Sequence, residues 1–268
     1  MPDSFGGSAS SDGRPMAVSA PAEATASKVV MPVYWLGLND SDVQLYREFL
    51  PSDNAGDPIG EAVQAMTTEV PQDADYFTPW HPASNVTASI SSKNVITVDI
   101  TSDAFKASLD SGMAHRAIQQ LVYTATAAAA NSGLTTAGFS TSVVVLVDGK
   151  AGYHAFGHES LEHPLERDAT LPAPIWIISP QEGEATETSL TVSGSAVVRD
   201  EQLSWSVEPI QHGRPDTAPV ASGTIQLNAG AGETALFEVP VKLEPGEYIL
   251  RVFHGDGANE DSKRINVY

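Results

Sequence analysis

The sequence contains no cysteine, which excludes thiol catalysis, thiolate metal sites and disulfides together. Cationic residues are scarce as well: 14 Lys and Arg stand against 34 Asp and Glu, for a formal net charge of -20. Proteins bind phosphate backbones and anionic lipid surfaces by placing cationic side chains on them. Nucleic acid and anionic lipid are therefore poor partners for this chain.

Long apolar runs are also missing. No stretch of about 18 apolar residues is present, so the sequence predicts no transmembrane helix. Residues 1–28 are rich in Ser, Ala, Gly and Pro and lack the apolar centre of a signal peptide. We interpret them as a disordered tether, and we expect any membrane attachment to come from an anchor absent from this sequence.

The chain has 268 residues, which is long enough for two domains of ordinary size. Residues 29–158 mix strand and helix patterns, which predicts an α+β domain. Apolar residues at three- and four-residue steps predict a helix over 111–130, with Gly133 available for a left-handed cap. A shorter helix is expected from Pro58, strands are expected at 29–37, 94–100 and from Thr141, and 43–51 fits a strand or a helical turn.

The sequence after residue 158 has the patterns of a linker followed by strands. Residues 159–172 are charged, proline-rich and without period, which indicates an interdomain linker. Residues 173–268 then predict an all-β, immunoglobulin-like sandwich of about seven strands. The expected strands are 175–178, 188–198, 203–210, 220–227, 234–243, 247–255 and 263–268.

Three residues sharpen the sandwich prediction. Trp205 falls on the third expected strand, where such sandwiches often bury a tryptophan. Tyr248, in LEPGEY at the start of the sixth strand, fits a tyrosine corner, in which the hydroxyl bonds backbone upstream. Gly194 interrupts an alternating strand and indicates a bulge or a close backbone approach.

Several segments together resemble a known domain pair. MPVYWLG, LYREF, HRAIQQLVYTATA and VVVLVDGK, in that order, resemble the GerMN domain of bacterial sporulation and spore-germination proteins. SPQEGEATETSLTVSGSA and FEVPVKLEPGEYILRVF resemble the immunoglobulin-like Gmad-type domain that accompanies it. The segment holding Tyr76, Phe77, Trp80 and His81 departs from the GerMN pattern, being richer in aromatic residues and proline.

The resemblance implies an extracytoplasmic protein of the cell envelope that is membrane-tethered and not an enzyme. Expected partners are envelope proteins or peptidoglycan, and self-assembly is a further implication. The family defines no catalytic residues and no cofactor, so none is carried over to this chain. A passive spacer that holds an absent partner away from the membrane is an alternative function.

An enzymatic alternative rests on histidines. His154, His158 and His163 lie in one short segment together with Glu159, Glu162 and Glu166. Imidazole and carboxylate groups are good zinc ligands, so the segment 154–166 suits a metal-dependent hydrolase. Gly152 and Gly157 oppose the helix that would align such ligands. A solvated loop leading into the linker explains the segment more simply, and no metal ligand is assigned.

The remaining polar candidates have structural explanations. Ser193 and Ser195 lack the G-x-S-x-G pattern of a nucleophilic serine. Asp99 alternates out of a strand, and Asp103 suits a helix N-terminus. Residues 254–261 are rich in oxygen ligands for calcium but lack the full loop pattern, and a hairpin turn at Asp256-Gly257 accounts for them.

Overall fold

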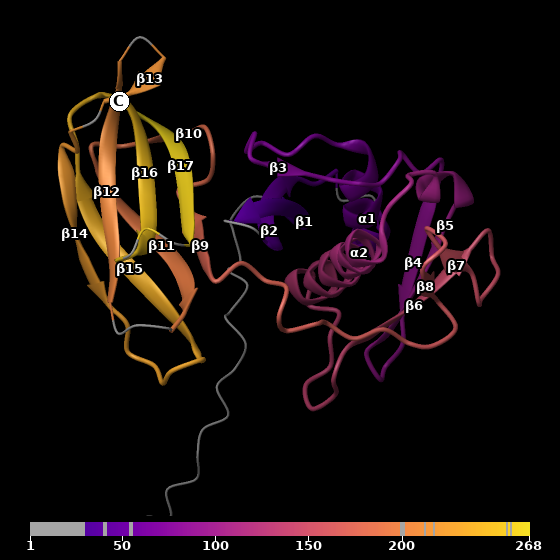
Figure 1. Cartoon of the computed structure of the whole chain (residues 1–268). Coiled ribbons are helices and arrows are strands. Elements are labelled where there is room, and N and C mark those ends of the chain that lie inside the picture. Colours follow the sequence, from indigo (N-terminus) through magenta and orange to yellow (C-terminus); the bar gives the residue numbers. More distant parts are fainter. Residues whose placement is uncertain are drawn as a thin grey trace, which may run out of the picture.

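The computed structural model describes residues 30–39, 42–53, 56–198, 202–211, 213–216, 218–255, 257 and 259–268. The tether predicted over 1–28 lies outside the described residues, as does Asp256. Figure 1 shows two bodies side by side, an N-terminal one with helices and a C-terminal one built of strands alone. The predicted order, an α+β domain followed by a β-sandwich, is confirmed.

The N-terminal domain contains short strands around two α-helices and one 3-10 helix. In chain order its elements are β1 (Val30–Asn39), β2 (Asp42–Pro51), α1 (Pro58–Thr68), β3 (Tyr76–Phe77), β4 (Val86–Ile90), β5 (Val95–Ile100), η1 (Ser102–Phe105), α2 (Ser111–Asn131), β6 (Ser142–Val147), β7 (His154–Ala155) and β8 (Glu159–Ser160). The segment 43–51, for which the sequence allowed a strand or a turn, is the strand β2.

Both α-helices begin at an aspartate whose side chain caps the first turn. The Asp57 side chain accepts the Gly60 N–H, and Pro58 occupies the first turn of α1, where a missing N–H costs nothing. The Asp110 side chain accepts the Met113 N–H at the start of α2. Gly133, with φ of 67°, follows the end of α2 and provides the left-handed cap that the sequence predicts.

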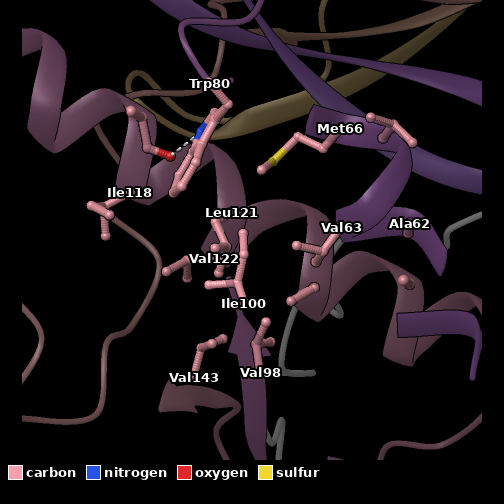
Figure 2. Close-up of a cluster of buried hydrophobic side chains, with 14 of the residues drawn as sticks. Ala62, Val63, Met66, Trp80, Val98, Ile100, Ile118, Leu121, Val122 and Val143 are labelled. Atoms are coloured by element: carbon pink, nitrogen blue, oxygen red, sulfur yellow. Dashed lines mark hydrogen bonds between the residues drawn. The ribbon is translucent and has the colours of Figure 1, made fainter. Parts of the chain in front are cut away.

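Two three-stranded sheets enclose these helices. One has the order β2-β1-β3, and the other has the order β4-β5-β6 with β5 and β6 parallel. Figure 2 shows the core between them, where Val63 and Met66 of α1 meet Leu121 and Val122 of α2. Trp80 is buried in this core, and its indole N–H donates to the Ala117 carbonyl oxygen at 3.2 Å.

One expectation about β6 is wrong. Its continuous apolar run predicts a strand covered on both faces, yet only Val143, Val145 and Val147 are fully buried. The alternate residues are half-buried, because the helices cover one face of this sheet. The dipeptide Asp148-Gly149 predicts a turn after β6, and both residues have positive φ there.

The C-terminal domain is a two-sheet sandwich. Its strands are β9 (Ile175–Ser179), β10 (Glu184–Thr186), β11 (Ser189–Val197), β12 (Gln202–Gln211), β13 (Arg214–Pro215), β14 (Ala221–Gln226), β15 (Thr234–Lys242), β16 (Gly246–His254) and β17 (Glu260–Val267). One sheet has the order β15-β11-β9, and the other joins β10, β17, β16, β12 and β13, with β14 paired to β12. This division of strands is that of immunoglobulin-like sandwiches.

Details of the sandwich bear out the sequence. The Tyr248 hydroxyl donates to the Glu244 carbonyl oxygen at 2.9 Å, which is the predicted tyrosine corner. The β9–β11 register shifts between Ser193 and Gly194, and a Cβ at Gly194 would lie 2.2 Å from the Phe237 ring. Gly194 therefore marks both a bulge and a close approach. Trp205 lies on β12 and is half-buried against the sandwich core.

The segment between the domains lies against the N-terminal domain. Leu165 forms an isolated bridge with Val143 of β6, and Pro172 forms one with Leu45 of β2. Leu161 and Leu171 are buried. These contacts hold much of 159–172 to the first domain.

Candidate functional site: the junction between the two domains

The histidines of 154–166 do not converge. His154, His158 and His163 are all exposed. Among the residues that the structure describes, no group of three or more His, Cys, Asp or Glu could hold a metal ion. The hydrolase alternative therefore loses the geometry on which it depended.

A different histidine has carboxylate neighbours. His115 of α2 lies with Nε2 3.2 Å from Asp168 Oδ2 and Nδ1 3.6 Å from Glu159 Oε1. Hydrogen bonds from the hydroxyl and the backbone N–H of Thr170, with a further contribution from His115, lower the pKa of Asp168 to about 2. These contacts tie the segment after β8 to α2. Local sequence patterns do not reveal these contacts, because His115 and Asp168 are 53 residues apart.

The other polar candidates have structural roles. Ser193 and Ser195 lie within the central strand β11. Asp99 accepts the Gly149 N–H at 2.9 Å and so fixes the turn after β6. Asp103 lies in the first turn of η1, and hydrogen bonds from Ser84 and Thr101 lower its pKa to about 2.

The most unusual polar cluster lies where the two domains meet. Lys263 of β17 is only 3% exposed, and its Nζ lies 2.6 Å from Asp73 Oδ2, 2.6 Å from the Tyr76 hydroxyl and 3.2 Å from Asp261 Oδ1. The Tyr76 hydroxyl donates to the same Asp261 oxygen at 3.1 Å. We call these four residues the Lys263 cluster. Two belong to each domain, so the cluster cross-links them.

The cluster keeps its lysine charged. Burial alone would lower the pKa of Lys263, but the carboxylates of Asp261 and Asp73 outweigh it and raise that pKa. Burial raises the pKa of Asp261, and the Lys263 ammonium opposes this effect. Burial and the charges of Asp261 and Asp73 raise the pKa of Tyr76 well above 10.0. A reactive lysine needs a lowered pKa, so this arrangement suits structural linkage and not nucleophilic chemistry.

Residues around the cluster hold it in place. The carboxylate of Glu48, on β2, accepts the backbone N–H groups of Gln72 and Asp73 at 2.9 and 2.8 Å. On the sandwich side, the Ile177 N–H donates to Asp261 Oδ2 at 2.6 Å. These hydrogen bonds position both aspartates in addition to their contacts with Lys263.

A second contact supports the junction. The Arg47 guanidinium of β2 lies 4.5 Å from the centre of the Trp176 ring on β9, a cation–π distance. Nearby, the Phe49 N–H donates to the Gln181 side-chain oxygen at 2.8 Å. The two domains therefore meet through polar, ionic and aromatic contacts along β2, β9 and β17.

Beside the Lys263 cluster lies a small pocket of about 260 Å³, which we call the junction pocket. Tyr46 and Tyr76 stack in its wall, with ring centres 4.6 Å apart, over Gly37. A Cβ at Gly37 would lie 2.8 Å from the Tyr46 ring, so a glycine is required there. The residues lining the pocket come from both domains: Leu38, Tyr46, Asp73, Asp75, Tyr76, Glu260, Asp261 and Ser262.

Sequence reasoning missed this site. Asp261 counted as a possible calcium ligand of the 254–261 loop, but it points inward and is fully engaged by Lys263, Tyr76 and the Ile177 N–H. The loop is the connection of the antiparallel β16–β17 hairpin, as its turn dipeptide indicates. A signal did exist: Asp261, Lys263 and Ile265 alternate on one face of β17, and all three are buried.

The fold and the junction define a class: a two-domain protein in which an α+β domain and an immunoglobulin-like sandwich are locked together. Residues 32–152 match the family model described as Germane: Sporulation and spore germination. This match confirms the predicted GerMN-type domain in the N-terminal half of the chain. The resemblance of the sandwich to the Gmad-type domain stays a prediction.

The solved structures that are similar over part of the chain include the tandem GerMN domains of the sporulation protein GerM from Bacillus subtilis. The identity is 18% and the TM-score 0.40, and the match covers 53% of this chain and 47% of that one. This chain thus matches about half of that structure. The family assignment rests on the sequence match. None of the curated proteins compared matches the chain. No helix in the described ranges has the length and apolar character needed to cross a membrane.

Proposed function

We propose that this protein is a non-enzymatic binding and assembly component of the cell envelope that acts as one two-domain unit. The observation that carries this proposal is the junction pocket, which both domains line and which the Lys263 cluster holds together. Pockets at domain boundaries are common binding sites. A partner that contacts this pocket contacts both domains at once.

The rim of the junction pocket has the composition of a contact surface. Leu38 lines the pocket and is 65% exposed, and Phe77, which follows the lining residue Tyr76 in the chain, is 37% exposed. Apolar side chains exposed beside a pocket are typical of interaction sites. The carboxylates of Asp75 and Glu260 flank them. Envelope proteins and peptidoglycan are the partners that the family membership favours, and an extracytoplasmic location follows from the same proposal.

The test places a photo-crosslinking amino acid at Leu38 in the native host and identifies adducts by mass spectrometry. Val220, which is 57% exposed in the sandwich, is the matched control position. We expect an adduct with an envelope protein from Leu38 and none from Val220, or co-sedimentation of the purified chain with peptidoglycan that Leu38→Glu abolishes. If neither occurs, the protein is a passive spacer and the proposal is wrong.

A further inference from the structure

A second hollow lies on the N-terminal domain, away from the junction pocket. It has a volume of about 450 Å³, within the range of about 300–1,000 Å³ that is usual for binding sites. The start of β1, the end of β2 and the last turn of α1 form its walls. Met31, Leu50 and Ala65 are buried residues of the core that reach this hollow. We call it the α1 groove.

The rim of the α1 groove adds a large exposed apolar side chain. Val70 is 82% exposed and directly follows Glu69, the residue that caps the C-terminal end of α1. A valine in this position makes no use of its apolar surface within the described part of the domain. It extends the apolar lining outward, to where a partner would pack.

All charged residues in the lining are acidic. They are Asp53, Glu61 and Glu69, and the described lining contains no Lys or Arg. Glu61 is held by hydrogen bonds, accepting the Asp53 N–H at 2.6 Å and the Ser52 hydroxyl at 2.9 Å. Asp53 and Glu69 are exposed.

The C-terminal end of α1 repels the negative charge of the acidic side chains in the groove. The C-terminal end of a helix carries a partial negative charge, which Lys, Arg or His in the last turn normally offsets. The last turn of α1 has no basic residue and is followed by Glu69 at the cap. A cation from a partner would offset the negative charge at this helix end. The α1 groove therefore combines an apolar floor with a rim that favours a positively charged ligand.

We propose that the α1 groove binds a short cationic segment of a partner protein, with an apolar side chain against Met31 and Val70 and a Lys or Arg beside Glu69. This inference rests on the proposed binding function and names the class of segment that the N-terminal domain takes. It concerns a surface separate from the junction pocket, because the two share no lining residue.

The test uses a short amidated peptide of Leu and Lys as the probe, and a copy in which every Lys is Glu. Binding to the full chain is measured by calorimetry, and the site is located by amide hydrogen exchange. We expect the cationic peptide to protect residues 64–70, and Glu69→Lys to weaken its binding on the order of tenfold. The Glu peptide should not protect these residues.

The control addresses the high net charge of the chain, which attracts any cation. Glu238→Lys changes the net charge by the same amount at an exposed site of β15 in the sandwich. It should weaken the peptide only slightly. Equal weakening by Glu69→Lys and Glu238→Lys, or binding without protection at 64–70, would overturn the proposal. Glu69→Lys should not unfold the protein, because a cation suits the end of α1.

Other occupants give distinct outcomes. If removing residues 1–28 exposes 64–70 in the absence of peptide, the groove belongs to the chain's own N-terminal segment. If the chain dimerises and Glu69→Lys abolishes the dimer, it belongs to a second copy. Either result overturns the proposal. Adducts at Leu38 that persist in the Glu69→Lys variant leave the proposed function standing whichever way the peptide test falls.

Discussion

The ammonium of Lys263 in the sandwich lies 2.6 Å from a carboxylate oxygen of Asp73 in the N-terminal domain, and both side chains are almost completely buried. Buried pairs of this kind add little stability compared with apolar residues, but the loss of one partner leaves an uncompensated charge. Lys263 also bonds Tyr76 and Asp261, so one side chain serves both domains. The relative position of the domains therefore depends strongly on this lysine.

Lys263→Met should destabilise the protein by about 3–5 kcal/mol, because Asp73 and Asp261 would remain buried without their cation. Urea unfolding followed by circular dichroism measures the change. Arg264→Met is the matched control, since Arg264 is the exposed neighbour on the same strand, and its effect should stay within about 0.5 kcal/mol. Equal unfolding midpoints for Lys263→Met and wild type would contradict the role of the cluster.

Tyr76 should resist ionisation in the folded protein, because burial and the adjacent carboxylates raise its pKa well above 10.0. At a pH near 10.0, the ordinary pKa of tyrosine, Tyr76→Phe should therefore leave the ultraviolet absorbance of phenolate unchanged in the folded protein. In denaturant the neighbours are lost, and the same substitution should remove about half the phenolate signal of one tyrosine, because an ordinary tyrosine is half ionised at that pH. A drop in phenolate signal in the folded state would show that the hydroxyl is not buried as described.

Asp168 should make the protein sensitive to strong acid. Its pKa is lowered to about 2 in the folded protein, from the ordinary value of 3.8, by hydrogen bonds from Thr170 first and by His115 in addition. A lowered acid pKa contributes stability that is present above about pH 4 and is lost as the pH falls towards 2. Wild type should thus exceed Asp168→Asn in unfolding free energy above pH 4, and the difference should shrink below it. A difference independent of pH would show that the ionised carboxylate is not what matters.

Gly194→Ala should destabilise the sandwich by about 1–3 kcal/mol, because the added methyl group would clash with the Phe237 ring and the Trp176 carbonyl oxygen. The matched control is Gly255→Ala, where nothing lies within 4 Å of a Cβ. Thermal unfolding of the two variants distinguishes them. Similar melting temperatures would mean that the β9–β11 contact adjusts without cost.

Much of the fold was predictable because it depends on local patterns. The seven expected sandwich strands appear within a few residues of their predicted bounds, since alternation over six or more residues identifies a half-buried strand. The strands β3, β4, β7, β8, β10 and β13 were missed. All of them except β4 have only two or three residues, which are too few to show a period, and β4 has five. The tyrosine corner at Tyr248 was predictable because its partner, Glu244, is only four residues away.

The candidate site was not predictable in the same way. The segment KRINVY predicts a strand at 263–268 whose alternation places Lys263 on the same face as Ile265, but the sequence does not tell which carboxylates would meet a buried lysine there. A lysine is normally exposed, so local reasoning assigns Lys263 to solvent. The metal site suggested by the histidines of 154–166 was wrong for the opposite reason. Closeness in sequence suggested a site, but a turn at Phe156 and Gly157, both with positive φ, separates His154 from His158, and all three histidines are exposed.

The sequence by itself determined the two-domain order, the helix α2, the alternating strands, the irregularity at Gly194 and the GerMN type of the first domain. Each depends on residue spacing within a short segment. Only the tertiary structure decided that Asp73 and Lys263, 190 residues apart, share a hydrogen bond and lock the domains. The physical reason is that a buried charge needs an oppositely charged partner beside it. The packing of the two domains determines which residue is that partner, and local sequence patterns within each domain do not.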